Sequence, residues 1–197
     1  ATRLVRAINY EQRLNFTFEP QTAWWFHEAL AADVIATVSH ERFAAAIIYA
    51  LQGPAGPEFL RRAEELKILD ALKIHLTDLV QVMFQVRRLL DNLAGLHLTS
   101  ENRLAVCLTG LVSAGADTHY LGEILCLKRE QKHCLKAAQH LWSKVEDNTS
   151  GNISLDYLTK ILDEADFTAI AFFWLQVNDE VLQSGLINYW MNRCTQD

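Results

Sequence analysis

Apolar side chains recur in steps of three and four along the middle of this chain. The members of this stripe are Leu69, Leu72, Leu76, Leu79, Met83, Val86, Leu90 and Leu93. Such spacing keeps them on one face of an α-helix. Further apolar residues lie beyond the stripe, so the helix needs neighbours on several sides. The pattern predicts one long, buried, central helix over about 58–94.

Helical patterns also cover most of the remaining chain. We expect helices at about 22–52, 100–145 (with a break near 113–116), 155–165 and 168–192. Residues 1–19 are expected to form an arm that packs on the body. We find no internal repeat and no linker that would separate two domains. The prediction is therefore all-α: residues 1–197 form a single-domain helical bundle of five or six helices around the long heptad-patterned helix.

Three large aromatic residues, Trp24, Trp25 and Phe26, stand in a row near the start of the 22–52 helix. Consecutive helical residues point in different directions, so the three rings cannot all face one core. We expect Trp24 or Trp25 to lie in an exposed apolar patch that binds a protein partner or a second copy of the chain. The alternative is that the N-terminal arm covers these rings.

The charge balance argues against binding of nucleic acid. Lys and Arg number 18 against 24 Asp and Glu, which gives a formal net charge of −6. Basic doublets occur at 61–62, 87–88 and 128–129, but acids or leucines flank each one. Because tight binding of nucleic acid needs many contacts between cations and phosphates, we expect no nucleic-acid partner.

Four cysteines, Cys107, Cys126, Cys134 and Cys194, form no Cys-x-x-Cys pair. They are read as buried free thiols of a cytoplasmic protein. Three glycosylation sequons, beginning at residues 15, 148 and 152, keep open the alternative of a secreted helical cytokine-like ligand. No apolar run approaches the roughly 20 residues that a membrane-spanning helix needs.

Metal-capable side chains follow one face of the predicted 100–145 helix: His119, Glu123, Cys126, Glu130, His133 and His140. Glu130-x-x-His133 has the spacing used by carboxylate-bridged di-iron bundles. Such a site needs a second Glu-x-x-His, which the sequence lacks, and the face rises about 30 Å along the helix. We expect a solvated face without metal, and Glu130, His133 and Cys126 are the candidates should a metal bind there.

No phosphate-binding loop, nucleophile elbow or metal knuckle is present in the sequence. The sequence does not decide whether the chain is an enzyme. We expect a non-enzymatic interaction or regulatory (adaptor) protein without a cofactor, which self-associates or joins a larger assembly. A metal-dependent helical-bundle enzyme using the His119–His140 face and the secreted ligand are the alternatives.

Overall fold

The computed structural model describes residues 1–96, 98–148 and 153–194. These residues form twelve α-helices and one short 3-10 helix, η1, with no strand among them. The elements are α1 (Thr2–Leu14), α2 (Pro20–Ala31), η1 (Val34–Thr37), α3 (His40–Leu51), α4 (Gly56–Glu65), α5 (Ile68–Ala71), α6 (Leu79–Asn92), α7 (Ser100–Ser113), α8 (Thr118–Ile124), α9 (Arg129–Asn148), α10 (Leu155–Leu162), α11 (Phe167–Gln176) and α12 (Glu180–Cys194). The all-α prediction is confirmed, but the helices are shorter and more numerous than the five or six expected.

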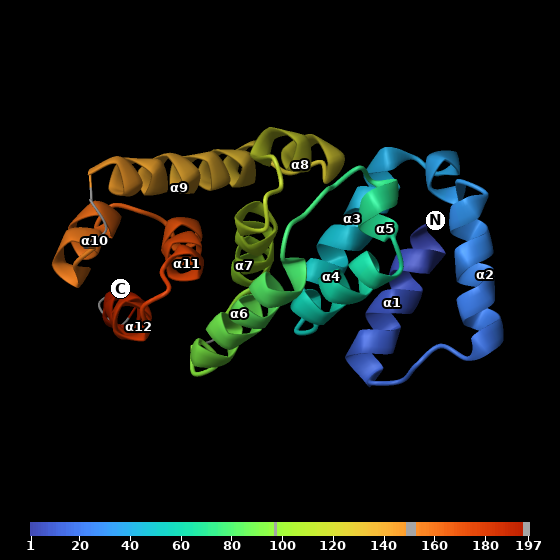
Figure 1. Cartoon of the computed structure of the whole chain (residues 1–197), viewed down its shortest axis with the longest axis horizontal. Coiled ribbons are helices and arrows are strands. Elements are labelled where there is room, and N and C mark those ends of the chain that lie inside the picture. The colour runs from blue at the N-terminus through green and yellow to red at the C-terminus, as the bar shows by residue number, and fades with distance from the viewer. Residues whose placement is uncertain (97, 149–152, 195–197) are drawn as a thin grey trace.

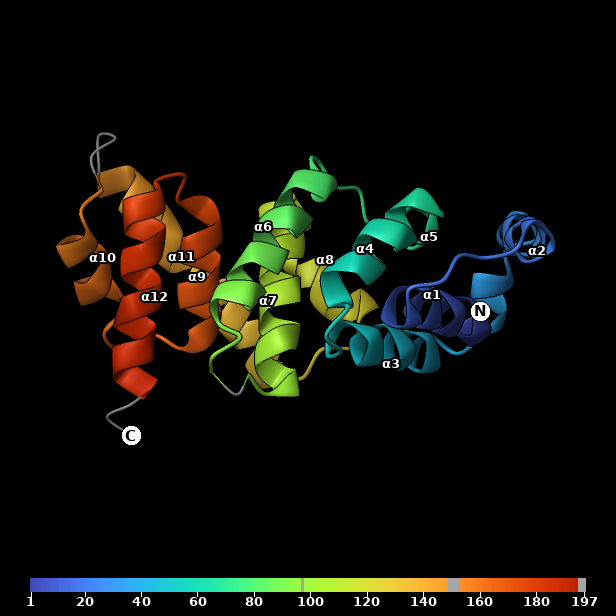
Figure 2. The same ribbon diagram turned by 90° about the horizontal axis from the view of Figure 1, so that it is seen from below.

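The helices lie in successive groups along the long axis of the molecule (Figure 1). One end holds α1–α5, the middle holds α6–α8, and α9 runs from the middle to the other end, which holds α10–α12 (Figure 2). None of the described helices is both long and apolar enough to cross a membrane. The described part of the protein is therefore an extended stack of short helices.

The predicted long central helix is in fact three helices, α4, α5 and α6. Lys67, Lys73 and Asp78 adopt left-handed backbone conformations with φ of 61°, 57° and 53°. A left-handed residue cannot continue a right-handed helix, so each one interrupts the run. The apolar stripe is nevertheless core: seven of its members are buried and Leu76 is partly buried. The periodicity predicted the buried positions correctly, but the prediction of one continuous helix was wrong.

Other predicted helices are interrupted in the same way. Residues 22–52 contain α2, η1 and α3, with Asp33 left-handed between α2 and η1. The break expected near 113–116 is present, because α7 ends at Ser113 and Gly115 has a φ of 101°. A second break at the left-handed Cys126 separates α8 from α9. Two sequons, beginning at residues 148 and 152, lie partly outside the described residues.

Helix α11 is the centre of the C-terminal half. Every residue of the 167–175 segment is buried, and the helix packs against α6, α7, α9 and α12. The indole of Trp142 on α9 meets the ring of Phe173 edge to face at 5.1 Å between centroids. Gln176 Nε2 donates a hydrogen bond to Ser113 Oγ at 2.8 Å, which ties the end of α11 to the end of α7. Burial on all sides explains why α11 is apolar on every face rather than amphipathic, with Thr168 and Gln176 as its only polar residues.

Candidate nucleic-acid interface

Helix α1 has one buried face and one strongly basic face. Val5 and Ile8 are buried where α1 packs on α3 and α4. The exposed side chains of the opposite face fall within about 80° of one another around the helix axis. They are Arg3, Arg6, Tyr10 and Arg13, which we name the α1 arginine face. The sequence carries this spacing, but we missed it because residues 1–19 were read as an arm rather than a helix.

Among the described residues, no carboxylate pairs with the α1 arginine face. Glu11 is the only acidic residue of α1, and its side chain is buried in an ion pair with Arg62. Within the described ranges, none of the three arginines of this face makes an ion pair or a side-chain hydrogen bond. Three free guanidinium groups beside an exposed tyrosine are suited to phosphate binding with stacking on a base.

The aromatic row on α2 divides between core and surface. Phe26 is buried and stacks on Phe18, with 5.8 Å between the ring centroids. Trp24 and Trp25 are exposed, at 54% and 58% of their surface. A second aromatic row, Phe172 to Trp174, is entirely buried in α11. The exposed tryptophans are therefore concentrated on α2.

The predicted metal-capable face is divided between α8 and α9. The left-handed turn at Cys126 changes the direction of the chain, so the six residues do not share one helix. Glu123 binds Lys132, with 2.5 Å between carboxylate oxygen and Nζ. Among the described residues, no three His, Cys, Asp or Glu side chains lie close enough to hold a metal ion. The structure thus does not bring Glu130, His133 and Cys126 together.

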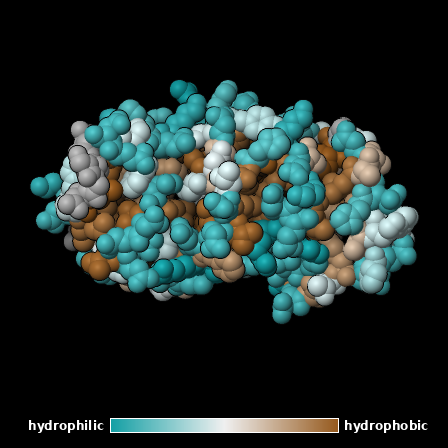
Figure 3. Space-filling view, in the orientation of Figure 1, coloured by the Kyte–Doolittle hydropathy of each residue, from teal (hydrophilic) through white to brown (hydrophobic). Residues whose placement is uncertain are grey.

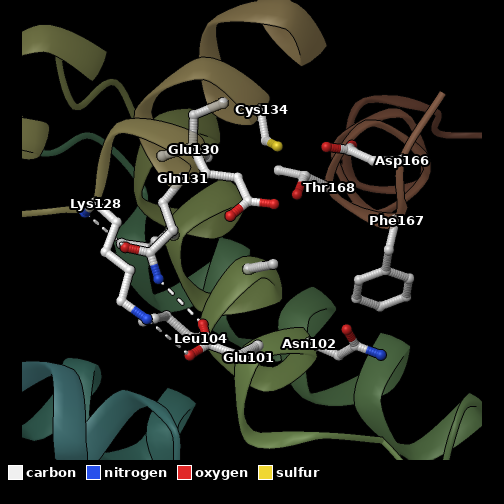
Figure 4. A pocket seen from close by; sticks show the side chains of 13 residues that line it. Glu101, Asn102, Leu104, Lys128, Glu130, Gln131, Cys134, Asp166, Phe167 and Thr168 are labelled. Carbon is white, nitrogen blue, oxygen red and sulfur yellow. Dashed lines mark hydrogen bonds and ion pairs between the residues drawn. The ribbon is translucent and has the colours of Figure 1, made fainter.

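A cavity of about 360 Å³ lies between α7, α9 and α11 (Figure 4). At its mouth, Glu101 accepts a hydrogen bond from Gln131 Nε2 at 3.1 Å and lies 3.8 Å from Lys128 Nζ. On another side of the cavity the thiol of Cys134 lies beside Asp166, and leucines together with Ala105 and Phe167 form the apolar part of the wall. Polar groups thus line one part of this cavity and apolar groups the rest.

The thiols in the described part of the chain are free but differ in environment. Cys107 is buried, Cys134 is half-buried and Cys126 is exposed, so the expectation of uniformly buried thiols is wrong for Cys126. Burial raises the pKa of the Cys107 thiol to about 12. Burial, followed by the hydrogen bond and charge of Asp166, raises the pKa of the Cys134 thiol to about 12. A thiol held protonated in this way is a poor nucleophile, so the cavity holds no activated cysteine.

No protein-family model matches this chain, and no curated protein matches it either. Solved structures of tRNA-processing enzymes do match. An apo form of a tRNA-processing enzyme has a TM-score of 0.73 and 18% identity over 96% of this chain and 55% of its own. The CCA-adding enzyme of Thermotoga maritima in complex with tRNA has a TM-score of 0.71 and 16% identity over 96% of this chain and 47% of its own. An apo CCA-adding enzyme has a TM-score of 0.70 and 16% identity over 96% of this chain and 46% of its own.

These matches overturn two expectations drawn from the sequence. A non-enzymatic interaction or regulatory protein was expected, and so was a protein or homo-oligomeric partner without nucleic acid. The matching structures described above are instead tRNA-processing enzymes, one of them bound to tRNA. Net charge alone does not exclude nucleic-acid binding, because it averages over the molecule, whereas binding depends on where charges gather. The chain spans about half the length of these proteins, and it has the helical fold of that half.

Proposed function

We propose that these helices form the RNA-contacting part of a tRNA-handling protein related in function to the CCA-adding enzymes. The observation that carries this proposal is the shared fold over 96% of the chain, including the match to an enzyme solved with tRNA. We assign RNA binding to this chain and no chemical step, because it spans about half of each matching enzyme.

The α1 arginine face supplies a physical reason for RNA binding. A guanidinium group is planar and donates paired hydrogen bonds to two phosphate oxygens. Arg3, Arg6 and Arg13 repeat this donor along about 15 Å of helix, which suits successive phosphates of one strand. Tyr10, 49% exposed, lies between them and offers a ring on which an unpaired base can stack.

Titration of the 197-residue chain with a tRNA transcript tests this proposal. Fluorescence anisotropy at several salt concentrations between about 50 and 300 mM gives the affinity and its salt dependence. We expect Arg3→Gln/Arg6→Gln to weaken binding and to reduce the slope of log K against log salt by about 1.5, since each lost phosphate contact contributes about 0.7–0.9.

The matched control is Arg61→Gln/Arg88→Gln, which removes the same charge from the exposed surface. Arg61 and Arg88 already pair with Glu65 and Glu180, so their loss should leave the salt slope almost unchanged. Absence of salt-dependent binding by the parent chain would refute the proposal. An equal loss in both double variants would show that net charge alone, not the α1 arginine face, governs binding.

We make three further proposals about this chain. We propose that Trp24 and Trp25 contact the partner, now by stacking on unpaired bases of the RNA. We propose that residues 1–197 form one domain, with the N-terminal segment packed on the body; the burial of Val5 and Ile8 against α3 and α4 supports this. We also propose a cytoplasmic location, which the free thiols of the described cysteines support.

A further inference from the structure

Helix α9 carries a second basic face, on a different part of the molecule from α1 (Figure 1). Leu135, Ala138, Trp142 and Val145 are buried on its inner side. On its outer side, five basic side chains fall within about 100° around the axis. They are Arg129, Lys132, His133, Lys136 and His140, which we name the α9 basic face. Hydrophilic residues cover most of the upper edge of the surface where α8 and α9 run (Figures 1 and 3).

One carboxylate, that of Glu123, is paired with this face, and Asp147 lies on the same side of α9 two turns beyond His140. Glu123 on α8 binds Lys132, and that contact, followed by the weaker influence of His119 and Lys136, lowers the pKa of the Glu123 carboxyl. The aliphatic stem of Lys132 lies over Gly122, where an added Cβ would meet its Cγ at 3.1 Å. In the described part of the chain, Arg129 and Lys136 have no ion pair. Two cations of the face are therefore unneutralised, and a third is shared with Glu123.

We propose that the α9 basic face binds the phosphate backbone of double-helical RNA, as a surface separate from the α1 arginine face. This inference rests on the proposed RNA-binding function. The face runs about 16 Å along a straight helix and exposes no Phe, Tyr or Trp ring, so it offers nothing on which an unpaired base could stack. An RNA duplex hides its bases in the stack and presents phosphates and 2′-hydroxyls, which lysine and arginine bind without reading sequence.

The two basic faces thus suit different parts of a folded RNA. The α1 arginine face includes Tyr10 and favours single strands, whereas the α9 basic face favours duplex. Figure 1 places α1 in the half of the molecule that holds the N-terminus, whereas α9 begins beside α8 near the middle and runs toward the other end, so the two faces are separate surfaces. A short stem and a short single strand are therefore separate probes of the two faces.

The test measures binding of a fluorescent RNA hairpin with a stem of about one helical turn and, in parallel, of a short single-stranded oligonucleotide. We expect Arg129→Gln/Lys136→Gln to weaken hairpin binding about tenfold at 0.1 M salt and to lower the salt slope by about 1.5. Binding of the single strand should stay within about twofold. Arg88→Gln/Lys160→Gln removes the same charge from the exposed parts of α6 and α10 and should change neither affinity.

A variant that is expected to strengthen hairpin binding distinguishes a specific surface from damage to the fold. Glu123→Gln removes the carboxylate beside Lys132, so hairpin affinity should rise by about two- to threefold. Hairpin binding that is unchanged in the α9 double variant but lost in Arg3→Gln/Arg6→Gln would overturn this proposal and leave the proposed function intact. A parent chain that binds neither RNA would overturn both.

Discussion

Arg62 holds the carboxylate of Glu11 in a two-point contact that joins α4 to α1. Arg62 Nε lies 2.8 Å from one oxygen and its terminal nitrogen lies 3.1 Å from the other. The side chain of Glu11 is 1% exposed, and it also accepts a hydrogen bond from the backbone N–H of Phe18 at 3.1 Å. The Phe18 ring lies 5.7 Å from the Arg62 guanidinium carbon. The pair therefore fixes both α1 and the chain that follows it.

Removal of Arg62 should destabilise the protein more than removal of Glu11. Arg62→Ala leaves a buried carboxylate without its counter-ion, which costs about 3–5 kcal/mol. Glu11→Ala leaves an arginine that is partly exposed and still paired with Glu65, so the loss should be smaller. Urea denaturation of both variants and of the double variant measures the coupling. If the two single variants lose equal unfolding free energy and the two losses add up in the double variant, the pairing is contradicted.

Gly110 sets the close approach of α7 to α6. A Cβ at this position would lie 2.5 Å from Val86 Cγ2 and 2.8 Å from Met83 Cε. Gly110→Ala should therefore destabilise the fold by about 1–3 kcal/mol, although alanine favours helix over glycine. Adding Val86→Ala should recover part of that loss. Gly95→Ala, where a Cβ meets nothing within 4 Å, is the control, and denaturation midpoints report the result.

The apolar stripe supplies core even though its helix is broken. Leu79 is 4% exposed at the start of α6, and its neighbour Val80 is 45% exposed. Leu79→Ala should lower the free energy of unfolding by about 2–5 kcal/mol, and Val80→Ala by under about 1 kcal/mol. Chemical denaturation measures both. A loss of unfolding free energy below about 1 kcal/mol for Leu79→Ala would show that the surrounding core fills the vacated space without destabilising the fold.

Alkylation should distinguish the cysteines of the described segments. At pH 8 a thiol with a pKa of about 12 is ionised in only about one molecule in 10⁴, so Cys107 and Cys134 should react slowly. Exposed Cys126 should be modified first. Asp166→Asn keeps a cap for α11 and removes the charge beside Cys134, so Cys134 should react faster while Cys107 does not change. Peptide mapping after timed iodoacetamide treatment gives the order, and unfolded protein is the control for full reactivity.

The exposed tryptophans of α2 should matter for single-stranded RNA and not for stability. Stacking of one base on an aromatic ring contributes about 1–3 kcal/mol, so Trp24→Ser/Trp25→Ser should weaken binding of an unpaired oligonucleotide at least fivefold. The melting temperature should stay near that of the parent, because both rings are more than half exposed. Loss of stability without loss of binding would instead indicate a structural role.

Sequence periodicity predicted which residues are buried better than where helices end. Leu79, Met83 and Val86 were expected in the core and are there, because the hydrophobic effect acts on each side chain wherever its helix stops. The helix ends were missed at Lys67 and Asp78 because these residues are left-handed without being glycine. Only glycine marks a left-handed position reliably in a sequence, so a lysine or aspartate in this conformation leaves no local pattern.

The basic faces were missed for a different reason. Arg3, Arg6 and Arg13 are scattered in the sequence and gather only when wound on a helix. Adjacent arginines such as those at 61–62 are easy to see in the sequence, yet Arg61 and Arg62 both pair with nearby acids and are not free to bind phosphate. A helical projection of each charged segment would have revealed both faces from the sequence. The match in fold, by contrast, could not be read from residues that share only 16–18% identity with the tRNA-processing enzymes.

The packing of α11 on α7 has a consequence for synthesis of the chain. Helix α7 ends at Ser113, and its partner begins only at Phe167. At a translation rate of about 5–20 residues per second, the side of α7 that faces α11 stays uncovered for roughly 3–10 s after α7 is made. During that interval the growing polypeptide exposes an apolar surface that favours aggregation at the ribosome. A chaperone that binds this surface would raise the yield of native protein.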